Sequence, residues 1–150
     1  VTSLSMYLSR EYELESLHSN KQFTPSSRYN LTNLFRSMFA LELENRLKKT
    51  SISVAVAHPG VTKSRQSRPY EVKKFKKSFY TYFSTNIQTG IAPIIQSIEE
   101  DNVSAERVYG PKFFGFYGQP ATMQHNKLVY NEELRNKLWT FTANELNLDL

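Results

Sequence analysis

Apolar side chains recur every three or four residues after Ser26, which is the spacing of one face of an α-helix. Ser26 or Ser27 is placed to cap the first turn, because a short hydroxyl accepts a hydrogen bond from a free backbone N–H, and Pro25 suits such a boundary. The pattern predicts a helix over residues 26–47. Its apolar positions are Tyr29, Leu31, Leu34, Phe35, Met38, Leu41 and Leu47.

The residues that follow this helix have the composition of a buried strand. Residues 51–58 are mostly small or β-branched, and Pro59 and Gly60 come directly after them. This predicts a buried parallel strand, and a helix followed by such a strand forms one half of a βαβ unit. Tyr29 and Asn33 lie one helical turn apart and share a face. Because open α/β sheets bind ligands at the carboxyl ends of their strands, this pair indicates a proton-transfer site.

The remaining pattern predicts elements on both sides of this unit. Residues 6–25 are polar and indicate a loop with a short helical turn, and residues 70–85 indicate a helix. A second helix is expected over residues 90–100. Its apolar stripe consists of Ile91, Ile94, Ile95 and Ile98. Residues 106–109 are expected to form the last strand, which ends in a turn at Gly110 and Pro111. Asn131 is expected to cap a final helix, in which Leu134, Leu138 and Phe141 form the buried face.

Composition narrows the class of protein. The chain has 150 residues, of which 39% are hydrophobic and 13% aromatic, so it has enough apolar side chains to build one core. It contains no cysteine, which fits a reducing cytoplasm and excludes disulfides. No run approaches the roughly 20 apolar residues of a membrane span. His18 and His125 have no partner at metal-ligand spacing, so we expect no metal site.

Positive charge is concentrated in residues 63–77. Seven lysines and arginines against Glu71 give this segment a charge of +6, so the rest of the chain sums to −1 against the total of +5. Aromatic residues interleave with these cations or follow them. Such a segment can bind phosphate backbones or anionic lipid surfaces. A solvated lid and helix face is the simpler interpretation, and we do not expect nucleic acid or a membrane as a partner.

Several motifs occur together in the order typical of one enzyme family. The chain resembles the C-terminal half of a short-chain dehydrogenase/reductase, nearest to the retinol-dehydrogenase-like branch. The motifs are Ser3, Tyr29-x-x-Thr32-Asn33, Glu42-Leu43-Glu44-Asn45-Arg46-Leu47, His58-Pro59-Gly60-Val61-Thr62, Gly90-Ile91-Ala92-Pro93, Tyr109-Gly110-Pro111 and Lys137-Leu138-Trp139. The resemblance implies an α/β fold that is the C-terminal portion of a Rossmann-type doubly wound parallel sheet. Residues 1–150 would then be a single partial domain lacking its N-terminal dinucleotide-binding half.

The resemblance also implies an activity and a set of site residues. It implies an NAD(P)-dependent oxidoreductase that interconverts a small carbonyl and an alcohol. Tyr29 would donate the proton, Ser3 would polarise the carbonyl, and Asn33 would take the position of the family's lysine. The cofactor, NADP or NAD, would be bound by Tyr29, Asn33, Pro59, Gly60, Val61, Thr62 and Ser64.

Asn33 changes what this site is expected to do. A free phenol has a pKa of about 10, so it needs a nearby cation to act as a base near neutral pH. Lysine supplies that charge in the family, whereas asparagine brings none. The neutral phenol is already the acid form, so reduction suffers less than oxidation. We therefore expect carbonyl reduction to be favoured.

The chain also departs from the family in its glycines. All five glycines follow residue 59, so no Gly-rich loop that would cradle a pyrophosphate is present. We expect a truncated or catalytically impaired enzyme that associates with itself or with the missing N-terminal half. The alternative is a non-catalytic remnant or binding module that uses the basic 63–77 segment.

Overall fold

The computed structural model describes residues 1–10, 24–63 and 84–148. The described elements are η1 (Leu4–Leu8), α1 (Pro25–Leu47), β1 (Val56–Ala57), α3 (Ile87–Glu99), β2 (Val108–Phe113), β3 (Tyr117–Met123), η4 (Lys127–Tyr130) and α4 (Glu132–Leu146). The three strands form a sheet in the order β1-β2-β3, with β1 parallel to β2 and β2 antiparallel to β3. This part of the chain is therefore an α/β fold whose sheet is mixed rather than wholly parallel.

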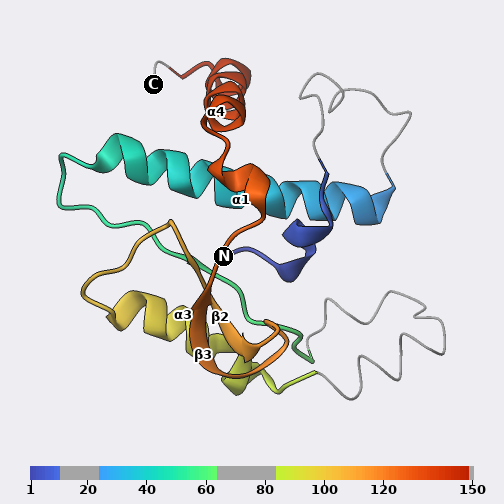
Figure 1. Cartoon of the computed structure of the whole chain (residues 1–150). Coiled ribbons are helices and arrows are strands. Elements are labelled where there is room, and N and C mark those ends of the chain that lie inside the picture. Colours follow the sequence, from blue (N-terminus) through green and yellow to red (C-terminus); the bar gives the residue numbers. More distant parts are fainter. Residues whose placement is uncertain (11–23, 64–83, 149–150) are drawn as a thin grey trace.

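Helix α1 is the central element of the molecule. It crosses the middle of Figure 1, with α4 on one side of it and the sheet and α3 on the other. Strand β2 contributes to both sides, because successive side chains of a strand point to opposite faces. Val108 joins the core cluster that contains Leu34 and Met38 of α1, whereas Tyr109 interacts with Glu100 at the end of α3.

The start of α1 differs from the prediction. Thr24, and not Ser26 or Ser27, is the N-cap, because its hydroxyl accepts a hydrogen bond from the backbone N–H of Ser27 at 3.1 Å. Pro25 therefore occupies the first helical position, where its missing N–H costs nothing and its fixed φ suits the helix. The predicted helix itself is confirmed to its last residue, Leu47.

The strand predicted over residues 51–58 is much shorter than expected. Only Val56 and Ala57 are strand, where they pair with Val108 and Tyr109 of β2. Ile52 is 60% exposed, so the first part of this apolar run lies on the surface. A strand needs neighbours as well as suitable side chains, and β2 reaches the run only at its end.

The predicted turn at Gly110 and Pro111 was wrong. Both residues lie inside β2, which continues to Phe113 and pairs with β3 as a hairpin. Phe114 and Gly115 form its turn with positive φ values of 51° and 72°. The strand predicted to be last is therefore followed by another one.

Helix α3 begins at Ile87, three residues earlier than predicted, and Asn86 caps it. Its buried residues are the small Gly90, Pro93 and Ser97. Most of the predicted apolar stripe faces outward, and Ile94 is half-buried. Its exposed members are Ile91, Ile95 and Ile98, and Ile87 joins them.

The final helix is confirmed, since the Asn131 side chain accepts from the N–H of Leu134 at 3.1 Å and so caps α4. Leu138 is buried in it and Leu134 packs against the core. Most of the predicted helix over residues 70–85 lies outside the described residues, and its last two, Ser84 and Thr85, are not helical. Most of the predicted loop over residues 6–25 also lies outside the described residues. Within the described ranges, no helix is both long enough and apolar enough to cross a membrane.

Candidate functional site

The first residues of the chain lie between β1 and α1. The backbone N–H of Thr2 donates to the carbonyl of Ala57 at 2.8 Å. The Thr2 hydroxyl donates to the backbone carbonyl of Asn33 at 2.9 Å. Thr2 is buried, so these bonds are shielded from water. They hold the adjacent Ser3 close to both the end of β1 and the third turn of α1.

Among the predicted site residues that the structure describes, Asn33 is the most enclosed, at 1% exposure. Its Nδ2 donates to the Tyr29 carbonyl at 2.8 Å and to Ser5 Oγ at 3.3 Å. Its Oδ1 accepts from Arg36 Nη1 at 3.3 Å. Both amide protons and the amide oxygen are therefore used within the chain, as a buried polar group requires.

Tyr29 lies one helical turn before Asn33 but is much more exposed. Its side chain is 43% exposed, and among the described residues nothing hydrogen-bonds its hydroxyl. Its carbonyl, however, accepts from Asn33. The structure thus fixes the backbone of this turn while leaving the phenol open to a ligand.

The Ser3 side chain is hydrogen-bonded to the backbone two residues further along the chain. Its Oγ accepts from the N–H of Ser5 at 3.3 Å and so caps η1. This leaves the hydroxyl proton of Ser3 available to a carbonyl oxygen. Ser3 and Ser5 belong to one short segment, and Ser5 is the member that reaches Asn33.

His58 supports the loop that follows β1. It is fully buried, and its Nδ1 accepts from the backbone N–H of Gly60 at 3.0 Å. Burial lowers its pKa from 6.5 to about 4, so the ring is neutral at physiological pH. A neutral ring supplies the lone pair that this hydrogen bond needs. His58 is therefore a residue that positions the Pro59-Gly60 turn.

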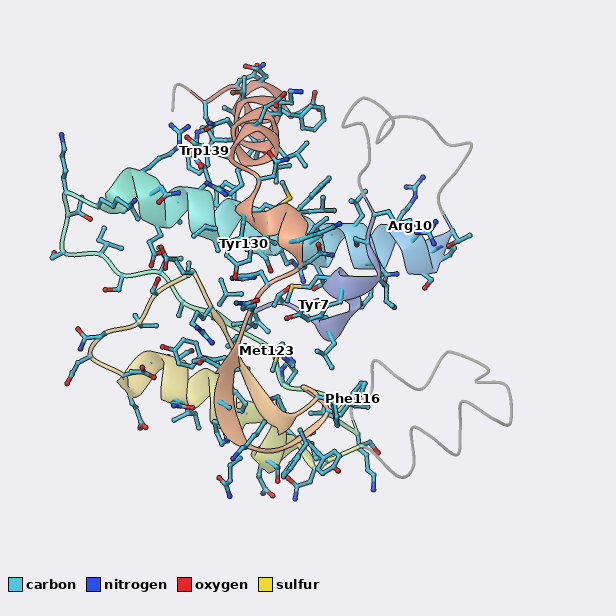
Figure 2. The ribbon with its side chains drawn as sticks, in the orientation of Figure 1. Tyr7, Arg10, Phe116, Met123, Tyr130 and Trp139 are labelled. Atoms are coloured by element: carbon cyan, nitrogen blue, oxygen red, sulfur yellow. The ribbon has the colours of Figure 1, made fainter. Side chains whose placement is uncertain are left out.

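The predicted cofactor-binding loop is held on two sides by other parts of the chain. The N–H of Val61 donates to the Phe116 carbonyl at 3.3 Å, at the tip of the hairpin (Figure 2). Thr62 forms a parallel bridge with Thr85, just before α3. Gly60 has φ +71°, a conformation that glycine adopts without strain. The remaining predicted member, Ser64, lies outside the described residues.

The hairpin turn connects the two halves of the candidate site. A Cβ at Gly115 would lie 2.5 Å from Leu4 Cδ2 and 3.2 Å from His58 Cε1. The turn therefore fits between the segment that carries Ser3 and the histidine that precedes Pro59. Ser3, the 29–33 turn and the Pro59-Gly60 loop are thus parts of one connected region.

Asn33 and the loop at Gly60, two parts of the predicted cofactor site, are closely engaged with other parts of the chain. Asn33 stands where the resemblance places a ribose-binding side chain, but its hydrogen bonds are already used within the chain. At Gly60, a Cβ would lie 2.6 Å from the Phe116 carbonyl oxygen, so protein atoms fill the space beside this loop. The region offers an exposed phenol and a serine hydroxyl, which suit proton transfer.

Sequence reasoning missed the residues that bind the site together. Thr2, Ser5 and Arg36 all hydrogen-bond Asn33, and none belongs to a motif. Arg36 could have been found, because it lies at i+3 from Asn33 on the same helical face. Thr2 and Ser5 meet Asn33 across about thirty residues of sequence, and no local pattern predicts such a contact.

Comparison with known proteins gives a distant but extended similarity. No family model matches the chain. Retinol dehydrogenase 14 of Mus musculus is 24% identical over 144 residues, which cover 93% of this chain and 41% of that protein. The Homo sapiens protein of the same name is 24% identical over 147 residues, with the same coverage. The chain therefore spans about two-fifths of the length of these curated relatives.

One solved structure is also similar. It is the crystal structure of an uncharacterized protein from Mycobacterium Paratuberculosis, which matches with a TM-score of 0.70 at 18% identity. The match covers 95% of this chain and 47% of the other. At this identity the likeness concerns the fold alone. The sequence similarity supports the resemblance to short-chain oxidoreductases at the level of the family, and the structural similarity supports the α/β fold.

Proposed function

We propose that this chain is an oxidoreductase of the short-chain dehydrogenase/reductase type that reduces carbonyl compounds. Its described sheet would then be part of a Rossmann-type arrangement. The 24% identity to retinol dehydrogenase 14 along 93% of the chain supports this assignment. The observation that carries it is the hydrogen bonding of residues 2–5 to the 29–33 turn, which brings the Ser3 segment to the turn that exposes Tyr29.

The proton-transfer chemistry follows from these two side chains. The Tyr29 phenol donates its proton to the carbonyl oxygen as that oxygen becomes an alcohol. Ser3 donates a hydrogen bond to the same oxygen and polarises it. In the relatives' family a reduced nicotinamide nucleotide supplies the hydride, and we assign none of the described residues to that step.

Reduction is the favoured direction because Asn33, unlike a lysine, brings no positive charge that would stabilise a phenolate. The Arg36 guanidinium donates to the Asn33 amide. Alcohol oxidation needs the phenolate as a base, and a phenolate without a nearby positive charge is costly near neutral pH. The relatives' name adds a retinoid alcohol or aldehyde to the substrates that should be tested.

The test is consumption of NADPH or NADH by the purified chain with small aldehydes and with retinal. Tyr29→Phe should lower kcat by roughly 10² to 10⁴-fold, the usual contribution of a general acid, a larger effect than any on nucleotide affinity. Tyr117→Phe, at another exposed tyrosine, is the matched control and should leave kcat unchanged. A folded chain that binds neither nucleotide would refute the proposal, and so would equal losses in both variants.

A second experiment concerns the missing lysine. Asn33→Lys should restore a cation one turn from Tyr29 and increase alcohol oxidation more than carbonyl reduction. Asn33→Met has a similar length without the charge and loses the same hydrogen bonds, so it separates charge from packing. If both variants respond equally, Tyr29 does not act as the base of this site.

The competing function is a non-catalytic binding module. The full use of Asn33 within the chain favours it, because that residue is committed to structure. The basic segment that this alternative uses lies outside the described residues, apart from Lys63. Salt-dependent retardation of nucleic acid, abolished by neutralising Lys73, Lys74, Lys76 and Lys77, would favour the module over the enzyme.

A further inference from the structure

A cavity of about 500 Å³ lies between the residues that follow η1 and the residues that lead into η4. Asn126 joins its two walls, because its Nδ2 donates to the carbonyls of Met6 at 2.9 Å and Ser9 at 3.3 Å. Tyr7 also spans the two walls by donating to the Gln124 carbonyl (Figure 2). The volume is in the range of small-molecule sites. The lining residues are Tyr7, Ser9, Arg10, His125, Asn126, Lys127 and Leu128.

The described lining of this cavity carries charge of one sign. Arg10 and Lys127 both line it, and among the described residues no aspartate or glutamate does. The ion pairs formed among the described residues involve other cations, namely Arg46, Arg135 and Lys137. Two cations that line one concave surface attract an anion, because both can interact with the same bound negative charge.

Two buried polar groups in the lining residues lack partners. Ser9 is 8% exposed and His125 is 5% exposed. Ser9 Oγ and His125 Nδ1 have no hydrogen-bond partner among the described residues. A buried polar atom without a partner destabilises the fold, and a ligand that hydrogen-bonds it removes that penalty.

The hydrogen bond on the other side of the His125 ring determines what Nδ1 can accept. Nε2 lies 2.8 Å from the carbonyl oxygen of Ala105. A carbonyl oxygen only accepts, so Nε2 carries the proton and the neutral ring presents a lone pair at Nδ1. Burial lowers the pKa of His125, which favours this neutral form. The Nδ1 atom of His125 can therefore accept a hydrogen bond only from a ligand atom that carries a hydrogen.

We propose that this cavity binds a phosphate group that retains a proton or carries a neighbouring hydroxyl. Arg10, Lys127 and the Ser9 hydroxyl donate to its anionic oxygens, and an O–H of the ligand donates to His125 Nδ1. The shared chemistry fits both free inorganic phosphate and a small phosphorylated polyol. The inference is independent of the proposed oxidoreductase function, because Ser3, Tyr29 and Asn33 do not line the cavity.

The test is calorimetric titration of the whole chain at pH 6 and constant ionic strength, with inorganic phosphate, glycerol 3-phosphate and sulfate as probes. Sulfate has the shape of phosphate and, at pH 6, a larger negative charge, but it carries no proton. If the site recognises the proton as proposed, sulfate should bind more weakly than inorganic phosphate despite that charge. The double variant Arg10→Gln, Lys127→Gln should weaken phosphate binding by at least about tenfold, because charge-assisted hydrogen bonds are lost. Ser9→Ala should weaken it less.

The matched control is the double variant Lys49→Gln, Lys112→Gln, which removes the same charge from exposed positions outside the cavity. It should leave phosphate affinity unchanged. Equal losses in the two double variants would show a diffuse field and overturn the proposal. The absence of saturable binding, or sulfate that binds as tightly as phosphate, would also overturn it. Tighter binding of glycerol 3-phosphate would support the site and identify a phosphorylated small molecule as its ligand, whereas equal binding would support free phosphate.

Discussion

Helices α1 and α3 each bury one face against the rest of the chain, but the buried faces consist of different kinds of residues. Helix α1 buries polar residues together with its leucines, and each of those polar groups finds partners. Helix α3 turns a face of small residues to the sheet and leaves its isoleucines in solvent. The buried set of α1 is Leu31, Asn33, Leu34, Ser37, Met38, Leu41 and Glu42, and that of α3 is Gly90, Pro93 and Ser97.

The difference shows that the apolar stripe of a helix does not by itself say which face is buried. At Gly90 a Cβ would lie 2.2 Å from Thr62 Cγ2, so α3 approaches its neighbour too closely for a larger side chain. On α1 there is room for long side chains, and Glu42 reaches Arg135 of α4. Close contact selects small residues, whereas wider spacing selects paired polar groups and large apolar ones.

The largest expected effect is at the polar contact between α1 and α4. Glu42 and Arg135 are both buried, and Glu42 binds Arg46 at 2.9 Å and Arg135 at 3.4 Å. Glu42→Gln should lower the free energy of unfolding by about 3–5 kcal/mol, because it leaves a buried guanidinium without its carboxylate. Urea denaturation measures this loss. Glu133→Gln removes an exposed pair with Lys137 and should have no measurable effect; equal effects would contradict the comparison.

His58 gives the next effect, through pH. Its pKa falls from 6.5 unfolded to about 4 folded, so between these values the unfolded chain binds the extra proton. Stability contributed by the neutral ring is therefore present above pH 6.5 and is lost as pH falls through this window. The loss should total about 3 kcal/mol and become constant below pH 4.

Urea midpoints measured from pH 7 to pH 4 test this expectation. His58→Asn keeps an acceptor for the Gly60 N–H and cannot titrate, so its stability should change less over the window. Burial also lowers the pKa of His125, which contributes in the same direction in both proteins and cancels in the comparison. Parallel pH profiles for the parent and the variant would show that His58 is not the responsible group.

Gly90→Ala tests the close contact of α3 and should cost about 1–2 kcal/mol. Alanine favours a helix by about 1 kcal/mol, but here its Cβ meets Thr62 Cγ2 at 2.2 Å and the Pro59 carbonyl oxygen at 3.2 Å. Thr62→Ser removes the clashing methyl and should recover part of the loss in the double variant. A Gly90→Ala chain that unfolds at higher urea than the parent would refute the proximity.

The outer face of α3 should give the smallest effect. Ile91→Gln with Ile95→Gln should change the free energy of unfolding by less than about 0.5 kcal/mol, because both side chains already contact water. Leu34→Ala on α1, at a buried position, should cost about 2–5 kcal/mol in the same assay. A large loss from the isoleucine pair would mean that a contact covers this face in solution.

Helices were predicted well where apolar periodicity and capping agreed. Asn131 begins α4 as expected, and the periodic pattern after residue 26 gives α1 nearly its full length. The error of the N-cap was avoidable. Proline is favoured at the first helical position, so the residue before Pro25 was the better cap.

Strands were predicted less well, because a strand depends on its neighbours. Residues 51–55 have strand composition, but only Val56 and Ala57 pair with β2. The hairpin did have a local signal that was missed, since Gly115 and Gly118 lie within an aromatic run and both adopt positive φ. The outward direction of the α3 isoleucines had none, because it follows from the distance between α3 and the loop at Thr62.

In the candidate site, too, local relations were predicted from sequence and distant contacts were not. The i, i+4 relation of Tyr29 and Asn33 was predicted from sequence, and the structure joins them by a hydrogen bond from side chain to backbone. The use of Asn33 by Thr2, Ser5 and Arg36 was not predicted, because it depends on how the first residues fold back. Motif spacing thus predicted that Tyr29 and Asn33 are neighbours, and long-range contacts determined which of their groups remain open.

The hydrogen bonds of Asn126 have a consequence for the order in which the chain folds. They join residues 117 and 120 positions apart in the sequence, namely Ser9 and Met6. Contacts of such separation carry a high loop-closure entropy and tend to form late. During synthesis, η1 cannot acquire these partners until Asn126 has left the ribosome. The segment that carries Ser3 should therefore be among the last parts of the molecule to become ordered.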